Sequence, residues 1–434
     1  MIPDWTILRN DLLKEQVYHG EVPPGLNLYI LPKKGYQKGY AVLATSFGSI
    51  DHRFMVNGRD EYVEIPDGVA HFLEHKLFED DRGDVFHRFA ALGAQANAFT
   101  SFTQTAYLFS STQNFADSLE LLLDFVQDPY FTEESVRKEQ GIIAQEIRMY
   151  DDNPQWRIFF NLLDALYREH PVKIDIAGTV ESISRITPEV LYRCYHTFYH
   201  PENMALFVVG GGIDPDEIGR QVARNYMARD YSPLGKIRRS YPREPSEINR
   251  RRVVQSMVVA EPLINIGFKD RSPESLPARE ALKHEIVNDL VMDIIFAESE
   301  PFYNELYEEG LINDQFEAGY VMDKNYAYTI ISAETRDPEL LYSRIMEGIE
   351  KTKAEGFGRE QVERLARAKL GNFMRRFNSL EYIANNFLAY RFRGLDFFAY
   401  PELLKEVTAE EANRCLREHL RDENHAVSII EKIE

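Results

Sequence analysis

The sequence is poor in cysteine, in positive charge and in long apolar runs, and each shortage argues against a class of protein. Its two cysteines, Cys194 and Cys415, cannot build the disulfide framework of a small secreted protein, and both fall in helical patterns that predict burial. Lys and Arg number 50 against 70 Asp and Glu, and the formal net charge of −20 opposes binding to nucleic acids and to anionic membranes. We therefore expect neither nucleic acid nor membrane as a partner.

The cellular location is expected from the same shortages. No run of about 18 apolar residues occurs, so no membrane-spanning helix is expected. The segment Met1–Trp5 lacks a basic start followed by an apolar run, so it does not resemble a signal peptide. These features favour a cytoplasmic protein. The composition is otherwise globular, with 44% hydrophobic and 28% charged residues, and the length suits two or three domains of about 150 residues.

The second half of the chain repeats part of the first half at one constant offset. The matched segments are Ile186–Glu189 with Val407–Glu410, Arg193-Cys194 with Arg414-Cys415, and Glu202-Asn203 with Glu423-Asn424. In both halves the match continues from a helical pattern into an apolar strand pattern. Several identities at one offset predict two homologous α+β halves, whereas a chance likeness of two amphipathic helices is the alternative.

The segment 230–252 differs in character from the sequence on either side. It contains Pro233 and Gly235, further prolines and a run of Arg and Lys, a composition typical of a linker. We therefore predict an N-terminal domain at 1–229, a linker, and a C-terminal domain at 253–434.

The strongest local signal is the segment His71-Phe72-Leu73-Glu74-His75. In a helix, His71 and His75 lie about 40° apart around the axis, and Glu74 lies about 60° to the other side of His71. The three side chains can therefore converge on one metal ion. Two surface histidines beside a solvated acid are the alternative, but the apolar residues around this segment argue against a fully solvated face.

A helical pattern at Thr132–Tyr150 could complete such a site. A catalytic zinc usually takes three protein ligands, and the third should come from a separate element. This pattern offers Glu139 and Glu146, which lie within about 20° of each other on one helix face. One carboxylate could bind the metal while the other accepts a hydrogen bond from a ligating histidine. A solvated acidic face is the alternative, although Glu146 lies among isoleucines.

Together these segments resemble the pitrilysin/insulinase (inverzincin) family of zinc peptidases, in the style of its small bacterial two-domain branch (the YmfH-like type). The resemblance rests on His71–His75, Glu139–Ile147, Gly93–Thr100, His170-Pro171, Gly178–Ile183 and Pro201–Met204. The expected fold is α+β, with two homologous domains that each pack an antiparallel or mixed sheet against helices and face each other as a clam shell.

The resemblance implies a zinc metalloendopeptidase that holds one Zn²⁺ per chain. By this likeness, His71, His75 and Glu146 bind the zinc. Glu74 is the general base toward zinc-activated water. Glu139 supports the site through one of the ligands.

Substrate binding is implied at the strand segment Asn97-Ala98-Phe99. There the resemblance predicts a sheet edge that accepts a peptide as an added β-strand. A turn or capping role for Asn97 is the alternative.

The second half departs from the family pattern. It has no H-x-x-E-H segment, so one zinc per chain is expected, and His284 alone favours a structural role. Family members commonly carry an Arg and a Tyr there that bind substrate and steady the tetrahedral intermediate, but Tyr307 and Asn313 stand at those places. A zinc-free homologous subunit could supply the missing pair in a heterodimer; otherwise the chain acts alone or as a homodimer.

The function expected first is a zinc endopeptidase that cleaves peptides or unstructured segments, as the catalytic subunit of a heterodimeric processing peptidase. Two other functions are alternatives to it. A non-catalytic scaffold or core subunit on the same fold would not need His71, Glu74, His75 and Glu146, so their presence argues against it. A maturation protease dedicated to one small peptide would use the same chemistry with a narrower substrate.

Overall fold

The structure is a computed structural model that describes residues 3–56, 61–80, 83–270 and 276–433. It divides into two compact units. Unit 1 comprises Met1–Ile147, Ile174–Tyr241 and Arg376–Phe392, and unit 2 comprises Arg148–Lys173, Pro242–Arg375 and Arg393–Glu434. Among the described residues no helix has the length and apolar character needed to cross a bilayer.

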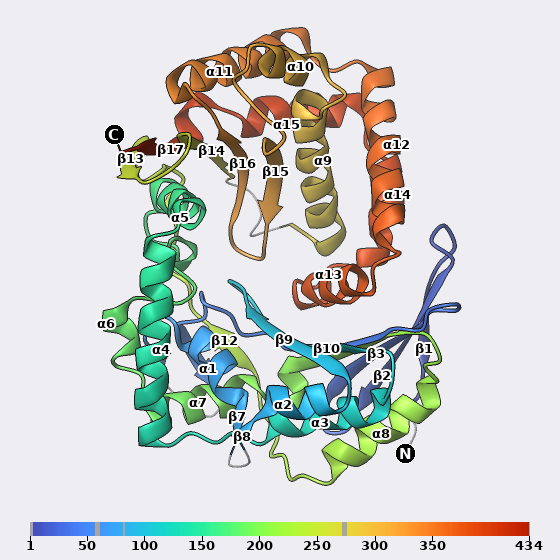
Figure 1. Cartoon of the computed structure of the whole chain (residues 1–434). Helices are drawn as coiled ribbons and strands as arrows, with labels where there is room; N and C mark the ends of the chain where they lie inside the picture. The colour runs from blue at the N-terminus through green and yellow to red at the C-terminus, as the bar shows by residue number, and fades with distance from the viewer. Residues whose placement is uncertain (1–2, 57–60, 81–82, 271–275, 434) are drawn as a thin grey trace. The chain divides into compact units, whose positions relative to one another are not determined.

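Unit 1 contains a mixed sheet of seven strands (Figure 1). They lie in the order β1 (Thr6–Asn10), β2 (Glu15–Val22), β3 (Leu26–Pro32), β11 (Met204–Gly210), β4 (Gly39–Thr45), β10 (Thr105–Ser111) and β9 (Ala94–Thr100). Strands β3 and β11 run parallel and the other neighbours run antiparallel. Every residue of the central strands β4 and β11 is buried, which explains why both read as continuous apolar runs in the sequence.

Helices and short strands complete unit 1. The helices are α1 (Val69–Leu77), α2 (Val85–Ala91), α3 (Phe115–Gln127), α4 (Glu133–Asp151), α6 (Val180–Ile183), α7 (Pro188–Phe198), η2 (Pro201–Asn203), α8 (Pro215–Met227) and α13 (Leu380–Phe392). The short strands are β5 (Arg53–Val56), β6 (Val63–Glu64), β7 (Glu79–Asp80), β8 (Gly83–Asp84) and β12 (Ile237–Arg239). The boundary between the two units falls near the end of α4, after Ile147.

Unit 2 contains a smaller mixed sheet of five strands. They lie in the order β13 (Arg252–Met257), β17 (His425–Lys432), β14 (Leu263–Lys269), β16 (Ala327–Glu334) and β15 (Glu317–Met322). The helices are α5 (Pro154–Leu166), η1 (Pro171–Lys173), α9 (Ala278–Phe296), α10 (Pro301–Glu308), α11 (Pro338–Glu355), α12 (Arg359–Arg376), η4 (Phe397–Ala399), α14 (Tyr400–Lys405), α15 (Ala409–His419) and η5 (Asp422–Asn424).

The two sheets share one topology, which confirms the prediction of two homologous α+β halves. The order β3-β11-β4-β10-β9 in unit 1 corresponds to β13-β17-β14-β16-β15 in unit 2, with the parallel pair in the same place. The repeated sequence forms α7 and β11 in one half and α15 and β17 in the other. Thr187 and Thr408 cap the two helices by accepting hydrogen bonds from the backbone N–H groups of Val190 and Glu411.

Each unit also includes one helix from the other half of the chain. Helix α5 packs on β14 and β17 of unit 2, and α13 packs on the corresponding strands β4 and β11 of unit 1. The exchange of helices is reciprocal, because each unit takes one helix from the other half of the chain. The two exchanged helices also occupy corresponding places in the sequence, since α5 follows the long helix α4 and α13 follows the long helix α12. The division of the sequence into 1–229, 230–252 and 253–434 stays a prediction.

The first part of the predicted linker is bound to unit 1. Strand β12 pairs antiparallel with β5. Beside it, Asp51 is 3% exposed and accepts hydrogen bonds from Arg239 Nε at 2.9 Å and from the Tyr241 hydroxyl at 2.7 Å. The buried carboxylate is thereby paired and hydrogen bonded, which offsets the cost of its burial.

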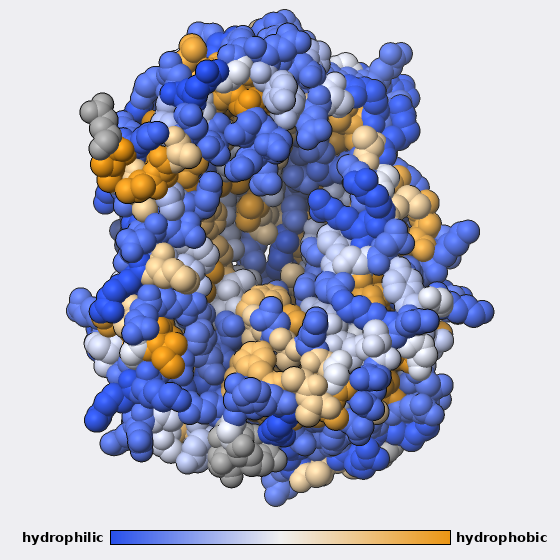
Figure 2. Space-filling model, in the orientation of Figure 1, coloured by the Kyte–Doolittle hydropathy of each residue, from blue (hydrophilic) through white to orange (hydrophobic). Residues whose placement is uncertain are grey.

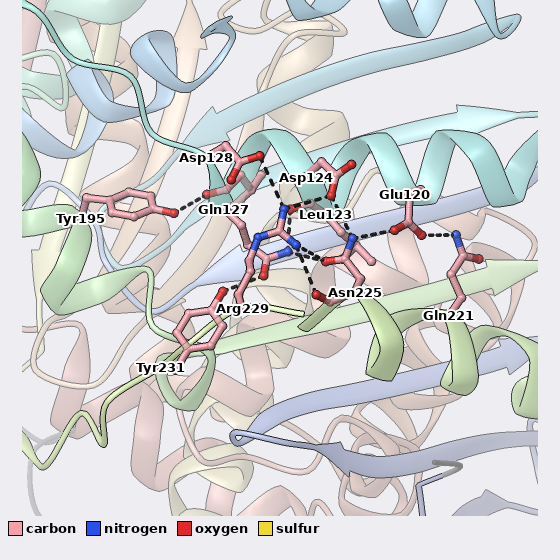
Figure 3. Close-up of polar contacts among 11 residues, drawn as sticks. Glu120, Leu123, Asp124, Gln127, Asp128, Tyr195, Gln221, Asn225, Arg229 and Tyr231 are labelled. Carbon is pink, nitrogen blue, oxygen red and sulfur yellow. Dashed lines mark hydrogen bonds and ion pairs between the residues drawn. The ribbon is translucent and has the colours of Figure 1, made fainter. Parts of the chain in front are cut away.

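A polar network fastens α8 to α3 (Figure 3). At its centre is Asn225, which is 4% exposed. Its amide donates to Glu120 and Asp124 at 2.7 and 2.9 Å. Its oxygen accepts from Gln127 and Arg229 at 2.8 and 3.1 Å. All the hydrogen-bonding capacity of this buried amide is used, so the network specifies how the two helices pack.

Strand β13 forms one edge of the unit 2 sheet and carries exposed apolar side chains (Figure 2). Val254 of β13 is 44% exposed, and Val258 and Ile433, which directly follow β13 and β17, are 85% and 52% exposed. Arg252 on the same edge is ion-paired with Glu339. A charged residue on an edge strand opposes edge-to-edge aggregation.

Candidate metal centre

Helix α1 is positioned by two glycines that bring its first turn against a neighbouring loop. Gly68 precedes the helix with φ of 91°, and a Cβ there would lie 2.4 Å from the Ala177 oxygen. Gly178, with φ of 75°, approaches the Asp67 carbonyl in the same way. The Ser182 hydroxyl donates to that carbonyl at 2.8 Å. Only glycine adopts this backbone without strain, so the close approach depends on these residues.

The buried side of α1 rests on aromatic side chains of the sheet. Phe72 and Leu73 are 0% exposed, as is Tyr107 of β10. The Tyr107 hydroxyl donates to the Leu73 carbonyl at 3.4 Å and lies 2.8 Å from the Tyr199 hydroxyl. Burial raises the pKa of Tyr107 well above its usual value, so the phenol keeps its proton and can donate to the helix.

The structure brings His71 and His75 of α1 together with Glu146 of α4. His71 Nε2 lies 3.8 Å from Glu146 Oε1, and His75 Nε2 lies 3.4 Å from Glu146 Oε2. One potential ligand atom from each residue lies within 4.8 Å of the other two. Among the residues that the structure describes, no other group of three or more His, Cys, Asp or Glu side chains is spaced so closely. Both imidazoles face the carboxylate with the same ring nitrogen, as ligands converging on one ion would.

Glu139, one of the two candidate carboxylates of α4, contacts a histidine from the far side of the ring. Its Oε1 lies 3.0 Å from His75 Nδ1. A carboxylate only accepts, so Nδ1 carries a proton. Nε2 is the ring nitrogen that faces Glu146. Burial lowers the pKa of His75, but the hydrogen bond with Glu139 and the surrounding carboxylates outweigh it and raise the pKa.

His71 is held in the neutral form that binds metals. Burial, with the nearby His75 adding to it, lowers the pKa of His71 to about 4. Its Nδ1 is buried and has no hydrogen-bond partner among the described residues.

Glu74 lies on the same helix and points to the sheet edge. The Thr100 hydroxyl, at the end of β9, donates to Glu74 Oε2 at 2.6 Å. Burial raises the pKa of Glu74, although the bond from Thr100 and the charge of His75 oppose the shift. A carboxylate with a raised pKa is a better proton acceptor near neutral pH.

The predicted substrate segment Asn97-Ala98-Phe99 lies on β9, which is an edge strand of the sheet. It pairs with β10 on one side, with Ala98 opposite Tyr107. Asn97 is exposed, and its Oδ1 accepts from the Ala98 backbone N–H at 2.9 Å. That N–H is therefore directed away from the ladder, so a peptide strand could replace the side chain as its partner.

The residues singled out in the second half lie in unit 2. Tyr307 is 55% exposed at the end of α10, and its ring stacks on Tyr303. Asn313 accepts a hydrogen bond from the Gln315 backbone N–H, which is a turn role. His284 Nε2 lies 2.7 Å from Asp270 Oδ2.

Two contacts near the site were not predicted from the sequence. Thr100 is the last residue of the segment Gly93–Thr100, whose strand character was expected. Its contact with Glu74 could not be expected, because it depends on how β9 packs against α1. Lys76 follows the histidines directly, yet it is 0% exposed and donates to Glu79 at 2.7 Å, which also binds Lys138 of α4. A lysine is almost never fully buried unless it is paired, so Lys76 would be expected at the surface. Nothing in the local sequence indicates its pairing.

The donor set suits zinc. Two imidazole nitrogens and one carboxylate are the ligand types that zinc takes in catalytic sites, where three protein ligands leave one position open. Neutral His71, the Nε2 atom of His75 and the carboxylate of Glu146 offer such a set on α1 and α4.

Comparisons with known proteins find matches to both halves of the chain. The family described as insulinase (peptidase family M16) matches residues 61–180, and the family described as the peptidase M16 inactive domain matches residues 185–369. The first match contains the whole candidate site. The second covers most of unit 2, where no counterpart of the H-x-x-E-H segment occurs in the sequence.

Individual relatives point to the same family. The Bacillus subtilis (strain 168) protein named "uncharacterized zinc protease YmfH" is 46% identical over 408 residues, which cover 94% of this chain and 95% of that protein. The zinc protease AlbF of Bacillus subtilis is 26% identical over 264 residues, 60% of each chain. An M16-like peptidase of Alicyclobacillus acidocaldarius superposes with a TM-score of 0.92 at 37% identity, covering 96% of this chain and 99% of that one. A Helicobacter pylori protease, with a TM-score of 0.80 at 18% identity over 99% of this chain and 100% of its own, shares the fold. The chain belongs to the insulinase family of zinc proteases, peptidase family M16.

Proposed function

We propose that this protein is a zinc metalloendopeptidase that cleaves peptides or unstructured segments. The observation that carries the proposal is the convergence of His71, His75 and Glu146 within 4.8 Å, beside a Glu74 carboxylate that is hydrogen bonded to the edge strand. In this proposal His71, His75 and Glu146 hold one zinc ion per chain.

The side chains around these ligands divide the chemistry between them. Zinc, when bound, is a Lewis acid that makes water more acidic and polarises a peptide carbonyl. Glu74 takes the proton of the attacking water and later delivers it to the leaving amine. Glu139 accepts from His75 Nδ1 and so fixes the tautomer and the direction of that ring.

The substrate peptide adds to β9 as a further strand. Main-chain hydrogen bonds along Asn97-Ala98-Phe99 supply affinity with little demand on the peptide sequence. The exposed position of Asn97 and the edge position of β9 support this mode. Because Thr100 of the same strand contacts Glu74, a peptide bound there would lie near the proposed base.

The test is hydrolysis of a quenched fluorescent peptide library by purified chain whose zinc content has been measured. Chelator-sensitive cleavage that is lost in Glu74→Gln is expected, while Glu134→Gln, a change at an exposed position of α4, should cleave as the wild type does. A chain that binds no zinc would contradict the proposal. One bound zinc without cleavage of the library would favour a maturation protease with a single substrate, a missing subunit or a scaffold role.

A partner subunit is part of the proposal. Tyr307 and Asn313 stand where an Arg and a Tyr are expected, and an oxyanion donor can contribute about 3–4 kcal/mol to the transition state. We infer that a zinc-free homologous subunit supplies the pair in a heterodimer, with a homodimer as the alternative. Sedimentation of the active species tests this inference, because full activity as a monomer would contradict both forms.

The same proposal places the enzyme in the cytoplasm without a nucleic-acid or membrane partner. The net charge of −20 supports it, because such a surface is repelled by anionic polymers and lipids. Cell fractionation followed by immunodetection tests the location, and recovery in the membrane or extracellular fraction would contradict it.

A further inference from the structure

Thr100 is the last residue of β9 and links that strand to the base of the proposed reaction. Its hydroxyl donates to Glu74 Oε2 at 2.6 Å, a short distance that is typical of an O–H group bonded to an ionised carboxylate. Helix α1 and strand β9 are thereby connected at the functional end of Glu74.

The backbone of Thr100 is firmly held. It lies opposite Thr105 in the β9–β10 ladder. The turn that follows is closed by a bond from the Ser101 N–H to the Gln104 carbonyl at 2.8 Å, and the Ser49 N–H donates to the Ser101 carbonyl at 3.0 Å. A hydroxyl on so fixed a backbone has few positions available, so it can orient the longer and more flexible Glu74 side chain.

The hydrogen bond also distinguishes the two oxygens of the carboxylate. Oε2 accepts from Thr100, which engages that oxygen in a strong, directed bond. A proton taken up by Glu74 would compete with this bond at Oε2 but not at Oε1. Oε1 is therefore the oxygen that is free to receive a proton.

We propose that Thr100 is a positioning residue, which holds Glu74 Oε2 so that Oε1 accepts the proton of the attacking water and returns it to the leaving amine. This inference rests on the proposed peptidase function. It also gives β9 two tasks, because the strand that binds the peptide at Asn97 and Ala98 orients the base at its last residue. Binding of substrate and placement of the base are then set by one rigid hairpin.

Substitutions at Thr100 test this role with the full-length, zinc-loaded chain and the library peptide that the wild type cleaves fastest. Thr100→Val and Thr100→Ala are expected to lower kcat about 10- to 100-fold with little change in KM, the range expected for loss of one hydrogen bond to an ionised group. Thr100→Ser keeps the hydroxyl and should stay within about threefold of the wild type.

A matched control separates positioning from stability. Thr105 lies directly across the ladder, and its hydroxyl donates to the Phe47 carbonyl at 2.9 Å rather than to Glu74. Thr105→Val should lower the melting temperature while kcat stays at the wild-type value. The Thr100 variants should show the reverse pattern, with zinc content and melting temperature near those of the wild type.

Failure of the inference about Thr100 can be distinguished from failure of the peptidase proposal. If the wild type cleaves peptides and Thr100→Ala keeps the wild-type kcat, the inference about Thr100 is wrong and the peptidase proposal stands. If the wild type cleaves nothing, crystal structures of the wild type and Thr100→Ala still decide. An unmoved Glu74 carboxylate in the variant would overturn the positioning role, whereas a rotated one would support it.

Discussion

His75 is the side chain in which the geometry of the centre is most fully specified. Its Nδ1 is engaged by Glu139 at 3.0 Å, and its Nε2 lies 3.4 Å from Glu146. The first contact places a proton on Nδ1, and the second shows that Nε2 is the nitrogen that faces Glu146. Glu139 is 7% exposed, so this carboxylate is not one of the solvated acids of α4.

Replacing Glu139 should therefore weaken metal binding although the residue does not face the ion. Glu139→Gln is expected to raise the Kd for zinc about 10- to 100-fold, because partners behind a ligating histidine have effects of that size. Competition with a chromophoric chelator measures the Kd. Glu134→Gln changes an exposed acid of the same helix and should leave it unaltered. An unchanged Kd in Glu139→Gln would show that His75 needs no such partner.

His419, a buried histidine of α15, makes unit 2 sensitive to acid. His419 is buried, and the Thr329 hydroxyl lies 2.7 Å from its Nε2. Burial lowers the pKa of His419 to about 4, with His284 and Arg421 adding to the effect and Asp270 opposing it. In the unfolded chain the pKa would be near 6.5. Between these values the unfolded state binds the proton and the folded state does not, so stability falls as the pH drops through this window.

The pH dependence of unfolding should show this group directly. At pH 5 the folded protein is expected to lose about 2 kcal/mol relative to pH 7.5 from His419 alone. Urea denaturation at both pH values measures the loss. The variant His419→Gln keeps a side-chain acceptor for Thr329 and should be less stable at pH 7.5, yet its stability should fall less on acidification. An equal loss in both proteins would mean that His419 does not carry the effect.

At the level of the element, α1 depends on the turn that precedes it. Gly68→Ala should destabilise the protein by about 1–3 kcal/mol, because an alanine at a φ of 91° is strained and its Cβ would lie 2.4 Å from the Ala177 oxygen. Gly141→Ala in α4 is the matched control, since a Cβ there meets no atom within 4 Å. That change should stabilise the helix by about 0.5–1 kcal/mol. Chemical denaturation compares the two, and equal effects would contradict the argument.

Several elements were predictable because their signals are local. The segment His71–His75, considered as helical, lies within α1 (Val69–Leu77), and the pattern at Thr132–Tyr150 became α4 (Glu133–Asp151). Apolar periodicity and capping residues act within a few residues of each other, so the sequence displays them. Strand β12 inside the predicted linker was not foreseen, because its pairing with β5 joins segments far apart in the chain.

At the scale of the whole molecule, the sequence halves and the compact units do not coincide. Phe387 of α13 comes from the second half but belongs to unit 1, where it is 1% exposed and its ring lies 5.0 Å from Tyr29 and 4.9 Å from Phe207. Helix α5 makes the opposite crossing. Each core therefore needs a helix from the other half of the sequence.

The two tryptophans allow this crossing to be tested. Trp5 lies in unit 1 and Trp156 in unit 2, so single-tryptophan proteins report each unit. Phe387→Ala should lower the denaturation midpoint reported by Trp5 fluorescence. The expected loss in the free energy of unfolding is about 3–5 kcal/mol, as for other large buried rings. Leu162→Ala in α5, at a site that is 0% exposed, should act first on the Trp156 signal. If Phe387→Ala shifted the Trp156 signal and spared Trp5, the assignment of α13 to unit 1 would be contradicted.

The sequence by itself indicated the family, the repeat and the helix faces shared by His71 with His75 and by Glu139 with Glu146. The helix faces follow from spacings of three, four and seven along single helices. The family and the repeat follow from residue identities that can be compared without knowing how the chain folds. The tertiary structure decided that Glu146 faces both imidazoles while Glu139 faces one from behind, that Thr100 contacts Glu74, and that α5 and α13 exchange units. Those contacts join residues distant in sequence, and only packing of whole elements against one another brings them together.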